Sequence, residues 1–130
     1  MFVITPVQDF DLAKEYCNTC NTYLRDGAFI YAMKDHKTGT LMGISQFEIC
    51  GDYGYIYDLC PVPGLDDFEA MFILGRQTMN FIDTCGAHEC RMPLSIEEST
   101  LIKAIGFSKK NDYYSCDMTG MFDGSHCGGH

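Results

Sequence analysis

The chain has 130 residues, a length typical of one domain, and its 46% hydrophobic and 21% charged residues indicate a globular protein with its own core. Nine Lys and Arg against 18 Asp and Glu give a formal charge of −9. This charge argues against binding to nucleic acid or to an anionic membrane surface, and no apolar run is long enough to span a bilayer.

The eight cysteines raise the question of the cellular compartment. Residues 1–6 show no basic segment followed by a long apolar run, so no secretory signal is visible. A core of this size does not need disulfides for its stability. We therefore expect reduced thiols in a cytoplasmic protein, with most cysteines packed as small apolar side chains.

The first half of the chain predicts one helix and four strands. A strand is predicted over residues 1–7, and Asp9 then suits the N-cap of a helix. The apolar stripe of this helix includes Leu12, Ala13, Tyr16, Cys17 and Cys20. Strands at 28–34, 40–50 and 53–60 follow, joined by tight turns as in an antiparallel meander. Pro61 ends the last of them, because proline cannot donate to a strand ladder.

The second half predicts two helices and three strands. A long helix is predicted over 66–84, capped by Asp66 or Asp67, and a strand over 88–94. Ser95 and Glu98 have the spacing of a capping box, so the next helix is predicted from Ser95 to Gly106. A hairpin covers 107–118. We expect a single domain over 1–118 and a loose, Gly-rich tail over 119–130.

Two segments resemble the GNAT acyltransferase family. Residues 73–81 (ILGRQTMNF) are similar to the family's helix after the cofactor loop, and residues 101–107 (LIKAIGF) to its closing helix. The resemblance, with the order of predicted elements, implies an α/β (α+β) fold with a mixed, mostly antiparallel sheet of about six or seven strands. It also implies helices on both faces, with the fourth and fifth strands splayed apart to receive acetyl-CoA.

The same resemblance implies a reaction, the transfer of an acetyl group from acetyl-CoA to a small primary amine or to a lysine-bearing partner. The acidic surface favours a cationic acceptor. In the family, the fourth strand and the loop after it receive the cofactor, and the corresponding positions here are Leu59, Cys60, Val62 and Gly64.

The reaction also needs a base that accepts a proton from the amine. Asp58 is the best-placed carboxylate on the fourth strand, and Glu48 on the third is the second candidate. Strict strand alternation predicts two groups on opposite faces of the sheet. These are Tyr53, Tyr55, Tyr57 and Leu59 on one face, and Ile56, Asp58 and Cys60 on the other.

Two departures from the family pattern affect the cofactor. The arginine and glycines of the family's pyrophosphate loop are replaced by Asp66, Asp67, Glu69 and Met71. Carboxylates at a helix N-terminus occupy the positive end of the dipole and repel a phosphate. Ile102 also stands where many members have a tyrosine that protonates the CoA thiolate. The alternative function is a non-catalytic module of the same fold that binds a protein or another ligand.

Cysteine and histidine clusters could hold zinc. The Cys17-x-x-Cys20 pair fits half of a zinc site, although both residues also lie on the apolar stripe of the first helix, which favours core packing. His126, Cys127 and His130 in the tail need a fourth ligand, either Cys116 or one from that pair. A homo-oligomer is compatible with the sequence.

Overall fold

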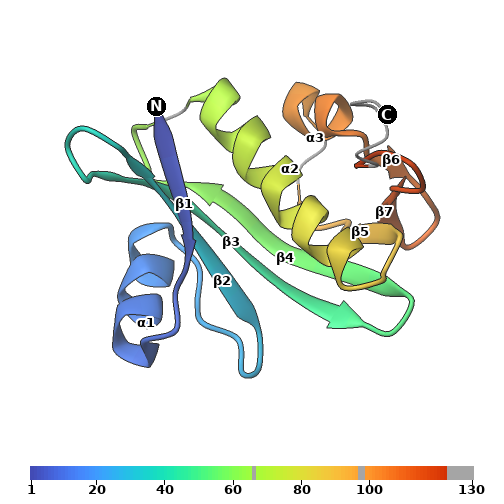
Figure 1. The fold of residues 1–130 in the computed structure, drawn as a ribbon, viewed down its shortest axis with the longest axis horizontal. Helices are drawn as coiled ribbons and strands as arrows, with labels where there is room; N and C mark the ends of the chain where they lie inside the picture. Colours follow the sequence, from blue (N-terminus) through green and yellow to red (C-terminus); the bar gives the residue numbers. More distant parts are fainter. Residues whose placement is uncertain (66, 97–98, 123–130) are drawn as a thin grey trace.

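Seven strands form one mixed sheet in the computed structural model, which describes residues 1–65, 67–96 and 99–122. The elements are β1 (Phe2–Pro6), α1 (Phe10–Thr19), β2 (Phe29–Asp35), β3 (Leu41–Cys50), β4 (Tyr53–Pro61), α2 (Phe68–Thr84), β5 (Glu89–Pro93), α3 (Thr100–Ile105), β6 (Ser108–Lys109) and β7 (Tyr113–Asp117) (Figure 1).

The strand order across the sheet is β1-β2-β3-β4-β5-β7-β6. All neighbours are antiparallel except β4 and β5, which are parallel and joined through α2. The predicted mixed, mostly antiparallel sheet is therefore confirmed. None of the helices in the described residues is both long and apolar enough to cross a membrane.

Helices cover both faces of the sheet, as predicted. Successive residues of a strand point to opposite faces, so Ala32 packs in the α1 cluster and Met33 in an α2 cluster. The α1 cluster contains Ala13, Cys17 and Cys20 from the helical segment and Ile30, Ala32 and Ile44 from the sheet. The main cluster on the other face joins α2 and α3 to β3, β4, β5 and β7, and Met121 and Phe122 pack against it from beyond β7.

The side chain of Asp9 begins α1, because it accepts hydrogen bonds from the backbone N–H groups of Asp11 and Leu12. Asp67 begins α2 in the same manner, by accepting a bond from Ala70. Both aspartates were predicted as caps, with Asp66 as the alternative for α2, and Asp66 lies outside the described residues.

The predicted start of α3 is wrong. The helix begins at Thr100 with Ser99 as its N-cap, whose hydroxyl accepts a bond from the Ile102 N–H at 3.3 Å. A turn closed by Ile96 N–H and the Pro93 carbonyl comes first, and Ile96 packs against the main core cluster. Ser95 therefore lies in this turn and does not cap the helix, and Gly106 ends the helix as predicted, at a φ of 128°.

Close contacts hold α2 on the sheet. A Cβ atom at Gly54 of β4 would overlap Ile82 of α2, and one at Gly75 of α2 would lie 2.8 Å from Ile105 of α3. Neither glycine can be enlarged without moving its neighbour. Gly54 therefore allows α2 to lie close to β4, and Gly75 allows α3 to lie close to α2.

The buried thiols of α1 give a direct test of this packing. Replacing Cys17, which is fully buried, with Ser places a hydroxyl in the apolar α1 cluster and should lower the free energy of unfolding by about 1–3 kcal/mol. Urea denaturation measures this change. Cys85→Ser is the matched control, because Cys85 is exposed and its replacement should leave the free energy of unfolding unchanged. Equal effects at the two positions would contradict the packing.

Candidate functional site

The parallel strands β4 and β5 pair over only three residues. Tyr53, Gly54 and Tyr55 of β4 lie opposite Glu89, Cys90 and Arg91 of β5, and the pairing stops there although β4 continues to Pro61. Beyond Tyr55, no strand of the described residues pairs with the edge of β4 that faces β5. The splay implied by the family resemblance is therefore present, and it forms the candidate site.

A β-bulge lies at the start of the splay. On β3, Gln46 pairs with Asp58 and the next residue, Phe47, pairs with Ile56, so that Tyr57 is an extra residue in β4. The predicted strict alternation of β4 side chains is therefore wrong. Ile56 packs in the main cluster beneath α2 and Leu59 lies against Gly75 of α2, whereas Tyr57, Asp58 and Cys60 all make their contacts on the α1 face.

Asp58 joins the sheet to the segment after α1. One carboxylate oxygen accepts a hydrogen bond from the Thr22 hydroxyl at 3.0 Å, and the other accepts one from the Gln46 amide at 2.7 Å. The Nε atom of Arg25 lies 3.8 Å from the second oxygen, and the side chain of Asp58 is only 13% exposed. Both oxygens of this predicted base are thus already engaged.

Glu48, the second predicted base, lies on β3 and accepts a hydrogen bond from the Tyr57 hydroxyl at 3.1 Å. Burial, together with this bond to a carboxylate, raises the pKa of Tyr57 to about 12. Tyr57 therefore remains protonated at neutral pH and keeps its hydroxyl directed at Glu48. The Tyr55 ring packs beside it, with centroids 5.0 Å apart.

The predicted cofactor positions on β4 differ in their surroundings. Leu59 is half-buried against Gly75 and the α2 clusters, at the open part of β4. Cys60 lies in the α1 cluster, where burial and then the Asp58 carboxylate raise the pKa of its thiol to about 11. Cys60 is therefore a neutral thiol at pH 7 and does not supply a thiolate nucleophile.

A tight turn follows β4. The Val62 N–H donates to the Met42 carbonyl of β3, and the Val62 carbonyl accepts from Leu65 N–H, both at 2.9 Å. Gly64 stands within this turn at a φ of 89°, a conformation that favours glycine. The backbone N–H and carbonyl of Val62 are therefore both already hydrogen-bonded within the protein.

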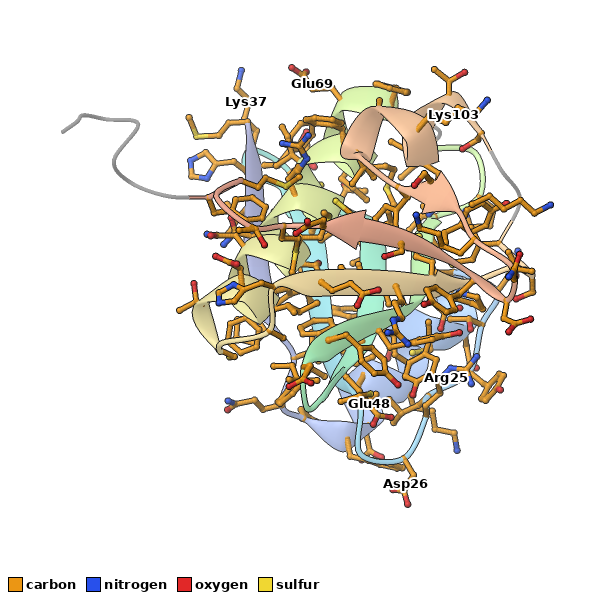
Figure 2. All side chains as sticks on the ribbon, turned by 90° about the vertical axis from the view of Figure 1, so that its right-hand side faces the viewer. Arg25, Asp26, Lys37, Glu48, Glu69 and Lys103 are labelled. Atoms are coloured by element: carbon orange, nitrogen blue, oxygen red, sulfur yellow. The ribbon has the colours of Figure 1, made fainter. Side chains whose placement is uncertain are left out.

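The N-terminus of α2 lies directly after this turn and does not have the character of a phosphate site. Asp67 caps it, and Glu69 adds an exposed carboxylate in the first turn. Figure 2 shows Glu69 at the upper end of the molecule, far from the part where Arg25 and Glu48 lie. The splay suits the acyl end of acetyl-CoA, but the carboxylates at α2 do not suit its pyrophosphate.

The closing helix contributes no acid to the site. Ile102, at the position of the family's tyrosine, is 3% exposed and lies in the main core cluster. The α3 helix is instead tied to α2 by Arg76, whose Nε donates to the Ile105 carbonyl at 2.9 Å. The family's tyrosine acid therefore has no counterpart at this position.

No group of three or more His, Cys, Asp or Glu side chains is gathered to hold a metal ion within residues 1–65, 67–96 and 99–122. Cys17, Cys20 and Cys116 are buried free thiols. Burial is the main reason that the pKa of Cys20 rises to about 12. His126, Cys127 and His130 lie outside the described residues, so the predicted zinc site in the tail is not tested.

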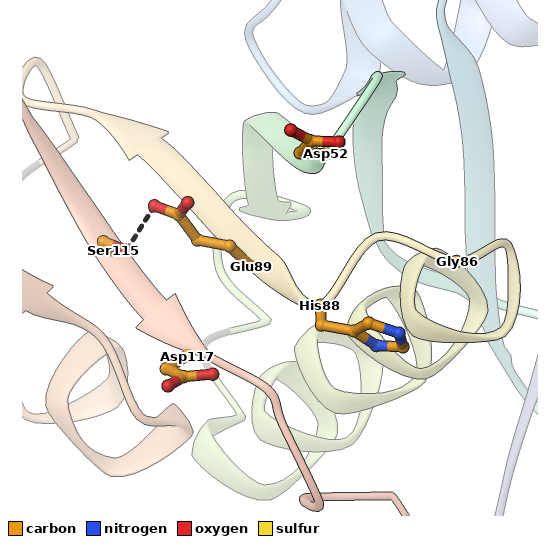
Figure 3. Close-up of a pocket in the computed structure, with 6 residues that line it drawn as sticks. All are labelled: Asp52, Gly86, His88, Glu89, Ser115 and Asp117. Carbon is orange, nitrogen blue, oxygen red and sulfur yellow. Dashed lines mark hydrogen bonds between the residues drawn. The ribbon is translucent and has the colours of Figure 1, made fainter.

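A separate cavity of about 530 Å³ lies where β5 and β7 meet the end of α2 (Figure 3). It is lined by Asp52, Gly86, His88, Glu89, Ser115 and Asp117. Its main polar groups bond to their neighbours. Ser115 donates to Glu89 at 2.8 Å, Glu89 also binds Arg91, and His88 Nδ1 lies 2.6 Å from Asp83. Because these polar groups are already paired with each other or with neighbouring residues, the splay is the stronger candidate for the functional site.

Arg25, Gln46 and Thr22 surround the site, and sequence analysis did not single them out. Gln46 is completely buried in β3. The sequence signal that could have identified it was a glutamine in the middle of a predicted strand, because a buried polar side chain needs hydrogen-bond partners. Its amide oxygen accepts from the Arg25 N–H at 2.7 Å, and its nitrogen donates to the Tyr23 carbonyl at 3.0 Å. Gln46 thus places the 23–25 segment over β4.

The contacts of Asp58 predict a structural effect. Asp58→Ala leaves the Gln46 amide and the Arg25 guanidinium without their carboxylate, so the free energy of unfolding should fall by about 2–4 kcal/mol in urea denaturation. Asp26→Ala, an exposed acid in the neighbouring loop, should change it by less than about 0.5 kcal/mol. A stable Asp58→Ala protein would show that Asp58 does not hold this segment.

No protein-family model matches the sequence, and no curated protein matches it significantly. Solved structures do match. The ribosomal-protein-S18-alanine N-acetyltransferase of Escherichia coli superposes with a TM-score of 0.73 at 9% identity, over 91% of this chain and 94% of the other. A GNAT family acetyltransferase from Brucella melitensis, in complex with acetyl-CoA, gives 0.67 at 11% identity, over 90% and 88%.

An E. coli protein assigned as an N-acetyltransferase and solved with coenzyme A bound is also similar, with a TM-score of 0.70 at 15% identity. It matches 90% of this chain and 98% of its own length. Likeness at such low identity concerns the backbone, and each comparison extends over nearly the whole domain. The fold of this chain is that of the GNAT N-acetyltransferases.

Proposed function

We propose that the chain is an acyl-CoA-dependent N-acyltransferase, which transfers an acetyl group from acetyl-CoA to a small primary amine or a lysine-bearing partner. The observation that carries this proposal is the separation of β4 from β5 after Tyr55 and Arg91. It leaves a strand edge open beside an apolar wall that contains Leu59 and Leu101. The structural relatives solved with CoA or acetyl-CoA support the same use of the fold.

The thioester would lie against β4 near the bulge, with Leu59 and the open backbone edge along its pantetheine arm. The proposal assigns no hydrogen bond to the cofactor from Cys60, Val62 or Gly64, which form the end of β4 and its turn. Cys60 packs on the α1 face, and the N–H and carbonyl of Val62 are already bonded to β3 and to Leu65. The carbonyl of the acyl group needs hydrogen-bond donors as charge develops on its oxygen, and a strand edge supplies such N–H groups.

The acceptor amine would approach from the α1 face, where Tyr55, Tyr57 and Glu48 lie together. Glu48 is the better base, since its contact with Tyr57 orients it, whereas both oxygens of Asp58 accept other bonds. The amine nitrogen forms a bond to the acyl carbon as the carbon–sulfur bond breaks, and Glu48 receives the proton of the amine. The thiolate takes its proton from solvent.

The alternative function, a binding module without catalysis, is favoured by one observation. The Asp67 cap and Glu69 place negative charge where the family binds pyrophosphate. Binding of acetyl-CoA therefore decides between the two functions.

Acetyl-CoA binding is the first test. Calorimetric titration should show binding to the wild type, and the double variant Asp67→Asn, Glu69→Gln should bind more tightly. Each charge near the helix terminus contributes about 0.3–1 kcal/mol, so the gain should be about 2–5-fold per residue. Asp26→Asn, at the opposite end of the molecule in Figure 2, should leave the affinity unchanged. No heat at high micromolar acetyl-CoA would favour the non-catalytic module.

Removal of the base is the second test. Glu48→Gln keeps the hydrogen bond to Tyr57 but cannot accept a proton, so kcat should fall by about 10²–10⁴-fold, with little change in the KM for acetyl-CoA. Release of free CoA thiol measures the rate. Glu15→Gln, on the exposed side of α1, is the control. An active Glu48→Gln enzyme combined with an inactive Asp58→Asn enzyme would instead assign the base to Asp58.

A further inference from the structure

Arg25 is held between two tyrosine rings above β4. Its guanidinium carbon lies 4.7 Å from the centroid of Tyr23 and 4.5 Å from that of Tyr57. Its backbone is fixed by the bond from its N–H to the buried Gln46. A cation in contact with two rings and anchored through its backbone is partly pre-organised for a ligand.

The Arg25 guanidinium forms an ion pair with Asp58 but donates no hydrogen bond to any described residue. Among the described residues no acceptor reaches its buried Nε, and the nearest carboxylate oxygen, on Asp58, is 3.8 Å away. The side chain is 31% exposed, so its terminal nitrogens are open to solvent. Guanidinium carries five N–H donors in a planar fork that matches a carboxylate. The unpaired donors therefore point to an anionic ligand.

Arg91 provides an internal comparison. It is also stacked on two tyrosines, with its guanidinium carbon 3.8 Å from the centroid of Tyr53 and 4.4 Å from that of Tyr113. However, it donates two hydrogen bonds to Glu89, at 2.9 and 3.2 Å. The stacked guanidinium of Arg91 is thus hydrogen-bonded to a carboxylate of the protein, whereas that of Arg25 has only the more distant ion pair with Asp58 among the described residues.

Tyr57 connects Arg25 to the proposed base. Its ring stacks on the Arg25 guanidinium, and its hydroxyl donates to Glu48. The partly exposed guanidinium of Arg25 and the carboxylate of Glu48 thus contact the same tyrosine, one at its ring and the other at its hydroxyl, at the start of the splay. Figure 2 shows both labelled side chains toward the same end of the molecule.

We propose that the acceptor is an amine that also carries a carboxylate, as an amino acid does. Its carboxylate binds the terminal nitrogens of Arg25 and its amino group lies at Glu48. This inference rests on the proposed function and specifies its substrate class. The net charge of −9 would by itself favour a purely cationic amine, but such a ligand would meet the positive charge of Arg25, whose guanidinium donors have no hydrogen-bond acceptor among the described residues.

The test compares ω-amino acids of two to six carbons with their methyl esters, which retain the amine and lose the negative charge. Binding is measured by calorimetry and by NMR titration, with and without saturating CoA, so that the result does not depend on turnover. We expect the best acid to bind the wild type at least about tenfold more tightly than its ester, as a charged bidentate pair allows.

Two variants assign the preference to a residue. Arg25→Lys keeps the positive charge but removes the planar fork, and should lose most of the preference for the acid. Arg91→Lys makes the same change in the other stack, where the fork is already bound to Glu89, and should keep the preference. Thermal melting of both variants confirms that they are folded before their affinities are compared.

Equal binding of acids and esters to the wild type would overturn the proposal. An acid preference that survives in Arg25→Lys, or disappears equally in Arg91→Lys, would also overturn it. Failure of the proposed function looks different, because it appears as no acetyl transfer from acetyl-CoA to any of these amines, whatever their affinity.

Discussion

One extra residue in β4 sets the geometry of the candidate site. The bulge at Tyr57 allows Ile56 and Leu59 to pack beneath α2 while Tyr57 and Asp58 both make contacts on the opposite face. Without it, strict alternation would place Tyr57 and Asp58 on different faces. The bulge lies two residues beyond the last β4–β5 pair. Tyr57 and Asp58 therefore both lie on the α1 face at the point where the pairing of β4 with β5 has ended.

Asp58 and Gln46 hold the segment after α1 against β4 beside the bulge. Between them they bond Thr22, Tyr23 and Arg25, all on the segment that leaves α1. Because Gln46 is fully buried, its hydrogen bonds are costly to break, and the segment is held firmly over β4. The Arg25 guanidinium then needs only the Tyr23 and Tyr57 rings to be positioned.

The two ends of the splay have different chemistry. At the α2 end, Asp67 and Glu69 satisfy the positive helix terminus with carboxylates, which opposes a phosphate. At the bulge end, Tyr57 contacts both Arg25, whose Nε has no hydrogen-bond acceptor among the described residues, and the carboxylate of Glu48. The total charge of the chain does not determine what either end of the splay can bind. The binding properties of each end depend on its own charged groups and on how they are paired.

The sequence by itself determined the order of the elements, most of their boundaries, the caps at Asp9 and Asp67 and the apolar character of Cys17, because these follow from side-chain periodicity and local hydrogen bonding. Its resemblance to a known family also implied the splay, and the positions of Asp58 and Glu48 on the predicted strands made them candidate bases, which stays a prediction. Sequence analysis missed the start of α3, because Ser95 has the spacing of a capping box but lies in a turn closed by Pro93 and Ile96, and Ser99 caps the helix instead. Tertiary structure alone decided the bulge at Tyr57 and the placement of Arg25, because both depend on pairing and stacking between residues far apart in the chain.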